Sequence, residues 1–246
     1  MGAPRCVAIQ GRTVTLPVEV RDASTANATY LVDAHAARGF LPGEELDVVE
    51  LLPGRALLSI GAIDYRDNDL GDYDEVSIAF FVRERRQPRG LPVLGPARDV
   101  VRGNVATWIH RLPVNQSFTC EAGCRIWGFP KVVNDIEIRR EGGRAVCDWS
   151  AEGRPVFRFS VPRAGRRSLP DRTLLTYTHI EGVPHVTAFR SGAEGVGFRM
   201  GGAEIELGSH PIADELRALG LPKRALMSAW MEHMRGRFEA PRKLEP

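Results

Sequence analysis

The sequence predicts an α+β protein built on a large, strongly curved antiparallel sheet, a β-barrel-like core with a few flanking helices. Many short segments of β-type composition follow one another with tight turns between them, and only four segments look helical. With 246 residues, 43% of them hydrophobic, the chain is long enough to bury a full core. No linker divides it, so we expect a single domain over residues 1–246.

The first half of the chain contains strands and one short helix. Thr13–Val20 alternates and is rich in β-branched residues, but Pro17 places it at a sheet edge. Asp33 can cap a helix from Ala34 to about Phe40. Apolar runs then predict the strands Arg55–Tyr65, Tyr73–Val82 and Val105–Leu112, with a Pro- and Gly-rich loop at Gln87–Pro96.

A short helix is predicted next, capped by Asn115 or Ser117 and running to Ile126. It leads into Gly128-Phe129-Pro130-Lys131. Pro130 fixes its own backbone and restricts the residue before it, so the lysine has a stiff approach.

The chain from Ile136 onward is mostly β-type. Turn residues separate predicted strands at Ile136–Arg140, Ala145–Ser150, Pro155–Val161, Leu174–Ile180, Val186–Arg190, Val196–Met200 and Ala203–Leu207. Two helices are predicted at the end, His210–Leu219 and Lys223 to about Phe238. The second would carry an apolar stripe of Leu226, Trp230, Met234 and Phe238, which is typical of core or of a subunit contact.

Composition excludes several functional classes. The net charge of +2 is too small to draw the chain onto nucleic acid, and its basic runs lack interleaved aromatic residues. No apolar run reaches about 18 residues, so we expect no membrane segment and a cytoplasmic protein. The six histidines are scattered, and Cys120 and Cys124 have no nearby partner to complete a metal site. His179 or His185 could line a pocket, although a structural role is the commoner one for such residues.

Lys131 is unusual in this chain, which has three lysines against thirty arginines. Its neighbours Trp127, Phe129, Val132 and Val133 are apolar. An ammonium that loses hydration becomes easier to deprotonate, whereas arginine stays charged, so the lysine is a candidate Schiff-base nucleophile. The alternative is a lysine whose stem lies on apolar surface with its charge in water.

The segment Gly123–Lys131 (Gly-Cys-Arg-Ile-Trp-Gly-Phe-Pro-Lys) resembles the lysine motif of the acetoacetate decarboxylase family. Gly71–Glu75 (Gly-Asp-Tyr-Asp-Glu) resembles that family's Gly-x-Tyr-x-Glu segment. The resemblance implies an acetoacetate decarboxylase-like barrel, a small keto-acid substrate, no cofactor and a homo-oligomer. It also implies catalytic roles for Lys131 and Glu75 and substrate contacts from Tyr73, Trp127, Phe129 and, by its place in the resemblance, Arg21.

Two departures from the family pattern leave the reaction open. Val132 stands where the decarboxylases commonly carry a second lysine, so only desolvation is left to lower the pKa of Lys131. Ile60 stands where they have a second active-site glutamate. Three hypotheses remain: a lyase that decarboxylates acetoacetate or a related 3-keto acid, a Schiff-base aldolase or dehydratase acting on pyruvate-like 2-keto acids, and a barrel that binds a small ligand without turnover.

Overall fold

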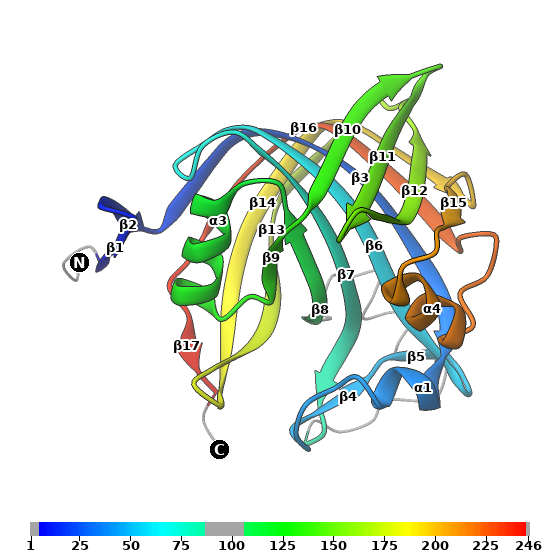
Figure 1. Cartoon of the computed structure of the whole chain (residues 1–246), viewed down its shortest axis with the longest axis horizontal. Coiled ribbons are helices and arrows are strands. Elements are labelled where there is room, and N and C mark those ends of the chain that lie inside the picture. Colours follow the sequence, from blue (N-terminus) through cyan, green and yellow to red (C-terminus); the bar gives the residue numbers. More distant parts are fainter. Residues whose placement is uncertain (1–4, 87–105, 245–246) are drawn as a thin grey trace.

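The computed structural model describes residues 5–86 and 106–244. Seven strands form a closed barrel in which each pairs with the next and the first pairs with the last (Figure 1). In spatial order they are β7 (Tyr73–Glu84), β6 (Arg55–Asn68), β3 (Val18–Asp33), β16 (Met227–Phe238), β14 (Val183–Met200), β13 (Arg167–Ile180) and β8 (Ala106–Val114). All these pairings are antiparallel except that of β13 with β8. The predicted fold class is therefore confirmed.

Short strands extend the barrel sheet at its margins. They are β4 (Leu46–Val48) on β7, β5 (Glu50–Leu52) on β6, β9 (Lys131–Val133) on β8 and β17 (Arg242–Lys243) on β14. β9 runs parallel to β8 and begins with the candidate lysine. The predicted loop at Gln87–Pro96 lies outside the described residues.

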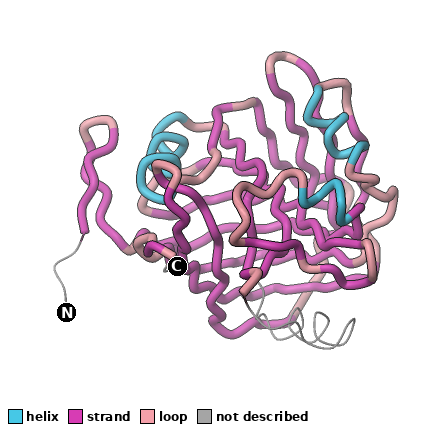
Figure 2. Tube along the Cα trace, turned by 90° about the horizontal axis from the view of Figure 1, so that it is seen from below, coloured by secondary structure: helices cyan, strands magenta, loops and turns pink. Residues whose placement is uncertain are grey.

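A separate four-stranded sheet packs against the barrel (Figures 1 and 2). Its order is β10 (Asp135–Glu141), β11 (Arg144–Ala151), β12 (Arg154–Pro162) and β15 (Glu204–Leu207), which confirms the predicted meander. Trp149 and Phe159 from this sheet share a buried cluster with Ile78 and Phe80 of β7. Two helices, α1 (Ala34–Arg38) and α4 (Pro211–Ala218), add residues to the same cluster.

A second buried cluster lies on the other face of β7. Successive strand residues point to opposite faces, so Ile78 and Phe80 belong to the first cluster while Tyr73 belongs to the second. The second cluster includes α3 (Ser117–Ala122) and the π-helical turn η1 (Gly123–Trp127), which lie beside β9. It also includes the hairpin of β1 (Arg5–Ile9) and β2 (Arg12–Leu16), which extends from one side of the body (Figures 1 and 2).

The predicted helix from Lys223 to Phe238 is wrong, because residues 227–238 form the barrel strand β16. The apolar residues at 230, 234 and 238 recur every four positions, a spacing that fits one helix face but also one strand face. Pairing with β14 on one side and β3 on the other decides between them. Trp230 and Met234 are both buried, but Trp230 lies in the first cluster and Met234 in the cluster that contains Tyr73, because the pairing with β3 shifts register between Met231 and Met234.

Smaller differences concern boundaries. Gln116 caps α3 in place of Asn115 or Ser117, and the helix changes to a π-helical turn at Gly123. The two strands predicted between residues 186 and 200 are one strand, β14. Asp33 does cap α1, with its Oδ1 accepting from the Ala36 amide at 2.7 Å.

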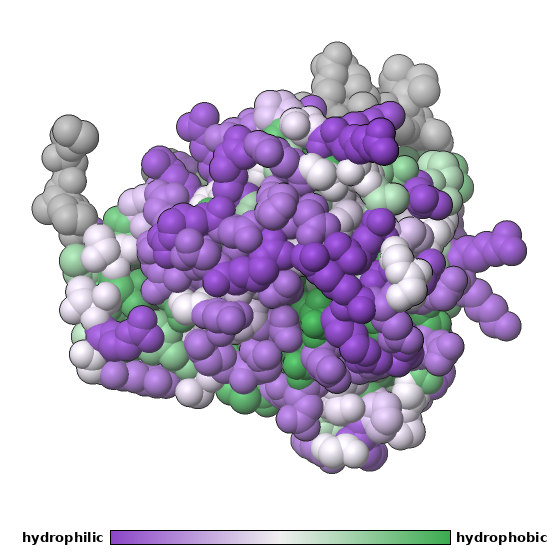
Figure 3. Space-filling model, turned by 90° about the horizontal axis from the view of Figure 1, so that it is seen from above, coloured by the Kyte–Doolittle hydropathy of each residue, from purple (hydrophilic) through white to green (hydrophobic). Residues whose placement is uncertain are grey.

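The surface view in Figure 3 is largely hydrophilic, with small and interrupted hydrophobic areas. None of the helices in the described residues is long and apolar enough to cross a membrane.

Candidate active site

A tightly folded segment, residues 117–130, leads the chain to Lys131. α3 runs into η1, and Gly128 ends that turn in a left-handed conformation, with φ of 67°. A Cβ on Gly128 would lie 2.4 Å from the carbonyl oxygen of His179 on β13, so only glycine fits there. Pro130 then turns the chain into β9, where Lys131 is paired with Leu112 of β8.

The amine of Lys131 lies in a buried polar cluster. Its Nζ is 2.8 Å from Oε2 of Glu75 and donates to Oγ1 of Thr119 at 3.2 Å. It also lies 4.9 Å from the centre of the Tyr73 ring. The side chains of Lys131 and Glu75 are only 4% and 8% exposed, so the alternative in which the lysine charge lies in water does not apply.

Gly123 explains why the lysine stem can lie so close to η1. A Cβ at this position would stand 2.5 Å from Cδ and 2.7 Å from Cε of Lys131. The first glycine of the lysine motif therefore leaves the space that the lysine side chain fills.

The pKa of Lys131 does not move in the expected direction. Burial lowers it, but Glu75 and Tyr73 raise it, and the net direction is upward. The expectation that desolvation alone sets a lowered pKa is wrong for the resting site, because the glutamate beside the amine stabilises the ammonium. At rest the site therefore holds a buried ion pair.

Two tyrosines lie next to this pair. Tyr65 of β6 stacks on Tyr73 of β7 with ring centres 4.5 Å apart. Burial raises the pKa of both phenols, with Glu75 contributing in the same direction, while Lys131 opposes the rise for Tyr73. Both therefore stay protonated and can donate hydrogen bonds near neutral pH.

Trp127 and Phe129 lie in the same buried cluster as Tyr73. Their rings stack at 5.7 Å, and both also contact the ring of Phe238 on β16. The indole nitrogen of Trp127 donates to the carbonyl of Glu239 at 2.9 Å. These contacts fix the turn that carries the lysine, and a contact with substrate stays a prediction for both residues.

The structure does not bring Arg21 to this cluster. Its guanidinium donates to Asp67 at 2.8 Å and to Asp69 at 2.7 Å, and its side chain is 50% exposed. No described contact joins it to Lys131 or Glu75. Its predicted role in binding a substrate carboxylate gains no support from these contacts.

The two departures from the family pattern occupy different surroundings. Val132 is half exposed, next to the lysine in sequence but on the opposite face of β9. Ile60 is fully buried in the first cluster, away from the amine. The next residue, Gly61, lies on the opposite face of β6, the face that carries Ile63 and Tyr65. Neither Ile60 nor Gly61 supplies a carboxylate.

Sequence reasoning found Lys131, Glu75 and Tyr73 but missed Thr119, Tyr65 and the role of Gly123. The sequence did contain a signal for Gly123, because it is the first residue of the lysine motif. Thr119 and Tyr65 had none, because their contacts depend on how α3 and β6 pack. The described residues contain no group of three or more His, Cys, Asp or Glu side chains placed to hold a metal ion.

Comparison with known proteins gives one family. The model of a protein family described as acetoacetate decarboxylase matches residues 7–237. A search of curated proteins finds no match.

Solved structures share the fold at low sequence identity. An acetoacetate decarboxylase from Legionella pneumophila is 15% identical, with a TM-score of 0.67, over 100% of this chain and 92% of that one. A second acetoacetate decarboxylase structure is 14% identical, with a TM-score of 0.66, over 93% and 89%. The enduracididine biosynthesis enzyme MppR, in complex with pyruvate, is 19% identical, with a TM-score of 0.61, over 93% and 90%.

Proposed function

Because this chain belongs to the acetoacetate decarboxylase family, we propose that it is a lyase that decarboxylates acetoacetate or a related 3-keto acid through an imine on Lys131. The observation that carries the proposal is the buried amine of Lys131 held 2.8 Å from the carboxylate of Glu75. A nucleophile in contact with a general base is what imine formation requires.

The proposed reaction begins with proton transfer from the Lys131 ammonium to Glu75. The neutral amine then attacks the keto carbon, and the protonated glutamate helps water to leave from the carbinolamine. The resulting iminium accepts the electron pair of the bond to the carboxylate, so carbon dioxide leaves and an enamine remains. Protonation of the enamine carbon and hydrolysis by water release the ketone and free the lysine. No cofactor enters this scheme.

The neighbours of the amine have distinct proposed roles. Thr119 accepts a hydrogen bond from Nζ and so orients the amine. Tyr73 lies beside it, and its neutral hydroxyl is a donor for the oxygen that leaves as water. Trp127 and Phe129 are proposed to provide the apolar wall of the substrate site.

A second candidate is a Schiff-base aldolase or dehydratase acting on pyruvate-like 2-keto acids. It is favoured by a specific observation: Ile60, which stands where the resembled decarboxylases have a second active-site glutamate, is buried in the first cluster and offers no carboxylate. MppR, a fold relative, has been crystallised with the condensation product of pyruvate and imidazole 4-carboxaldehyde. The amine and Glu75 would serve this chemistry equally well, because it also begins with an imine and an enamine.

The test is intact mass after incubation with acetoacetate, and separately with pyruvate, in the presence of borohydride. We expect a reduced adduct on the wild type that is absent from Lys131→Met, a variant that keeps the buried stem, and retained in the matched control Lys223→Ala. Release of carbon dioxide from acetoacetate then identifies the decarboxylase. Condensation of pyruvate with an aldehyde, followed by absorbance of a conjugated product, identifies the alternative.

An adduct that persists in Lys131→Met would place the imine elsewhere and refute the proposal. A folded wild type that gives no adduct with either acid would favour the barrel that binds a ligand without turnover.

A further inference from the structure

Three neighbouring barrel strands carry small side chains beside Glu75. On the face of the sheet that carries Glu75, residues of β3, β6 and β7 form three successive rows across the strands. The first row is Thr25, Ile63 and Glu75, the second is Asn27, Gly61 and Ser77, and the third is Thr29, Ser59 and Ala79. We call these residues the Glu75 block. Consecutive rows are two residues apart, so they are separated by about 7 Å along the strands.

The second row of the block is accessible to solvent, although the first is buried. Asn27 and Ser77 are both partly exposed, and Gly61 lies between them without a side chain. A Cβ on Gly61 would stand 3.2 Å from Nδ2 of Asn27 and 3.9 Å from Cβ of Ser77. The two polar side chains therefore approach each other across the glycine, one row away from Glu75.

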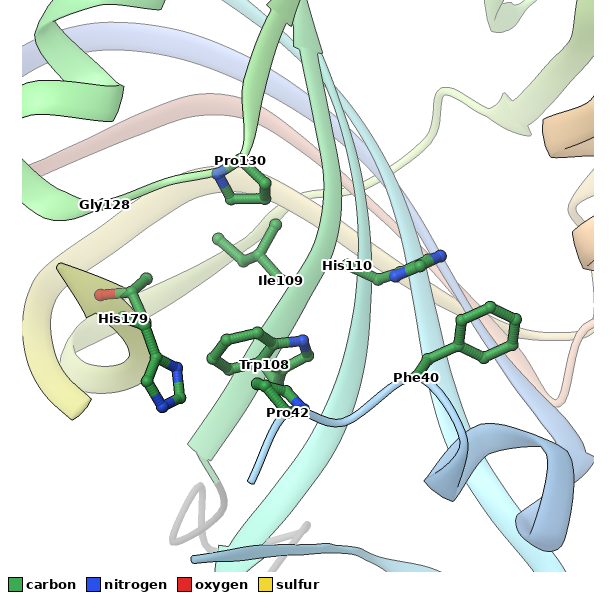
Figure 4. Close-up of a pocket in the computed structure, with 9 residues that line it drawn as sticks. Phe40, Pro42, Trp108, Ile109, His110, Gly128, Pro130 and His179 are labelled. Atoms are coloured by element: carbon green, nitrogen blue, oxygen red, sulfur yellow. The ribbon is translucent and has the colours of Figure 1, made fainter. Parts of the chain in front are cut away.

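The block ends at an apolar residue on its β8 side. Ile109 pairs with Ala79 and so continues the third row onto β8. It also lines an open hollow of about 210 Å³ near the segment that leads to Lys131, and Figure 4 shows Ile109 and Pro130 on the same side of that hollow. The polar groups of the second row come from the strands farther from the hollow, at Asn27 and Ser77.

Asn27 and Ser77 have hydrogen-bonding capacity to spare. Nδ2 of Asn27 donates to Oγ of Ser59 at 3.0 Å, and Oγ of Ser59 donates to Oδ1 of Asn27 at 3.3 Å. These contacts orient the amide and use one of its two N–H groups. The hydroxyl of Ser77 makes no hydrogen bond within the described part of the chain.

The charge of the block restricts what Asn27 and Ser77 can bind. Glu75 is the only ionisable residue among the nine, and the nearby amine of Lys131 is the group that forms the imine. A carboxylate next to Asn27 would be largely buried without a cation of its own, which is costly. A hydroxyl group can accept from the second N–H of Asn27 and donate to Ser77. The second row therefore suits a neutral hydrogen-bonding group.

We propose that Asn27 and Ser77 determine substrate specificity by binding a hydroxyl group two carbons beyond the keto carbon. This inference rests on the proposed imine at Lys131, which would hold the keto carbon beside Glu75. Two carbons, an oxygen and a hydrogen bond span roughly the distance from the first row to the second. The carboxylate of the substrate leaves as carbon dioxide, so the hydroxyl belongs to the part that remains in the ketone. The substrate class is thus a δ-hydroxy-β-keto acid.

The experiment compares 4-hydroxy-2-butanone with 2-pentanone, which has a methyl group in place of the hydroxyl. Both are ketones of the kind that remains after loss of carbon dioxide. Each forms an iminium with Lys131 by loss of water, and hydride from cyanoborohydride reduces it to a stable adduct. Intact mass at a fixed time gives a half-saturation concentration for each ketone. The value for 4-hydroxy-2-butanone should be about 3–10-fold lower, the usual effect of one hydrogen bond.

Two variants test the assignment. Asn27→Leu keeps a side chain of similar size that makes no hydrogen bond, so the preference for 4-hydroxy-2-butanone should disappear. Ser77→Ala is a smaller change, which keeps the test valid if Asn27→Leu fails to fold, and it should reduce the preference at least about twofold. Ser150→Ala is the matched control, because Ser150 is also partly exposed but lies on β11, outside the block. Its preference should equal that of the wild type.

Equal half-saturation concentrations for the two ketones on the wild type would overturn this inference. A preference that neither Asn27→Leu nor Ser77→Ala reduces would overturn it as well. In both cases the adducts would still support an imine on Lys131. No adduct from either ketone on a folded wild type would instead refute the proposed imine, and this inference with it, so the two failures are distinguishable.

Discussion

Lys131 and Glu75 are bound to each other in a form that cannot itself react with a carbonyl. An ammonium is not a nucleophile, and the glutamate 2.8 Å away favours the ammonium. The same contact also allows the amine to be activated, because one proton transfer within the pair gives a neutral amine and a neutral acid. Two neutral groups are easier to bury than two ions, so a substrate that excludes water from the site would favour this transfer.

Glu75→Gln tests this balance. Without the Glu75 carboxylate, burial still lowers the pKa of Lys131, and the negative charge that raised this pKa is absent. The pKa should therefore fall below that of the wild type. Adduct formation with the keto acid should nevertheless slow by about 10²–10⁴-fold, because the acid and base is lost. The pKa is measured from the pH dependence of acylation of Lys131, followed by peptide mass spectrometry.

Glu84→Gln is a suitable control on the same strand, where Glu84 accepts a hydrogen bond from Tyr177. It should change neither the pKa of Lys131 nor the rate of adduct formation. An unchanged pKa in Glu75→Gln would contradict the ion-pair description.

Individual residues were predictable from the sequence only where chemistry and motif coincided. Lys131 is rare in type and lies in an apolar motif, and Glu75 and Tyr73 alternate on one strand face, so all three could be found. Arg21 was placed by resemblance alone, and its partners are the nearby acids Asp67 and Asp69. The direction of the lysine pKa could not be predicted, because it depends on a distance between two strands.

At the scale of elements, the π-helical turn η1 determines where the lysine side chain lies. We predict that Gly123→Ala reduces adduct formation at least tenfold and lowers the free energy of unfolding by about 1–3 kcal/mol, the usual cost of overpacking a buried site. The added Cβ would stand 2.5 Å from Cδ of Lys131, and a flexible stem can move away without breaking the fold. The moved amine would no longer meet Glu75. Rates come from borohydride trapping and stability from urea unfolding.

Gly39→Ala makes the same chemical change at the end of α1, where the new Cβ would meet only a carbonyl oxygen at 3.2 Å. Its trapping rate should equal that of the wild type. Equal rates for Gly123→Ala and wild type would show that the contact with η1 does not position the amine.

Elements with a clear alternation were predictable, and those decided by distant partners were not. β7 and the meander of β10, β11 and β12 have alternation and turn residues within themselves. β16 has three Met among its 12 residues, and its apolar period of four fits a helix as well as a strand. Its two neighbours in the sheet come from residues 18–33 and 183–200, and no local pattern contains that information.

For the whole molecule, the sequence predicted a curved sheet but not how it closes. Closure depends on the pairing of β7 with β8, and on the parallel pairing of β13 with β8. The predicted homo-oligomer is also a property of the whole molecule. Light scattering coupled to gel filtration should give a multiple of the chain mass of 27.2 kDa, and a mass equal to one chain would refute that prediction.

Asp74 joins the barrel to the four-stranded sheet, and it makes the stability of the whole molecule depend on pH. Its Oδ2 accepts from the amide of Ile138 on β10 at 3.3 Å. Burial, together with the negative charge of Asp64, raises the pKa of Asp74 from 3.8 to about 7. The native state therefore holds this proton where the unfolded state has lost it, so the contribution of Asp74 to stability falls as pH rises from about 4 to about 7.

Asp74→Asn keeps an acceptor for the Ile138 amide but cannot ionise. Its free energy of unfolding should exceed that of the wild type by about 1–2 kcal/mol at pH 8, less than the full pKa shift implies, because water screens a partly exposed carboxyl. At pH 4 the two proteins should be nearly equal, since Asp74 is then protonated in the native wild type. Urea unfolding at both pH values provides the measurement, with the exposed Asp135→Asn as control. A variant less stable than the wild type at pH 8 would mean that the charge on Asp74 stabilises the contact between the two sheets.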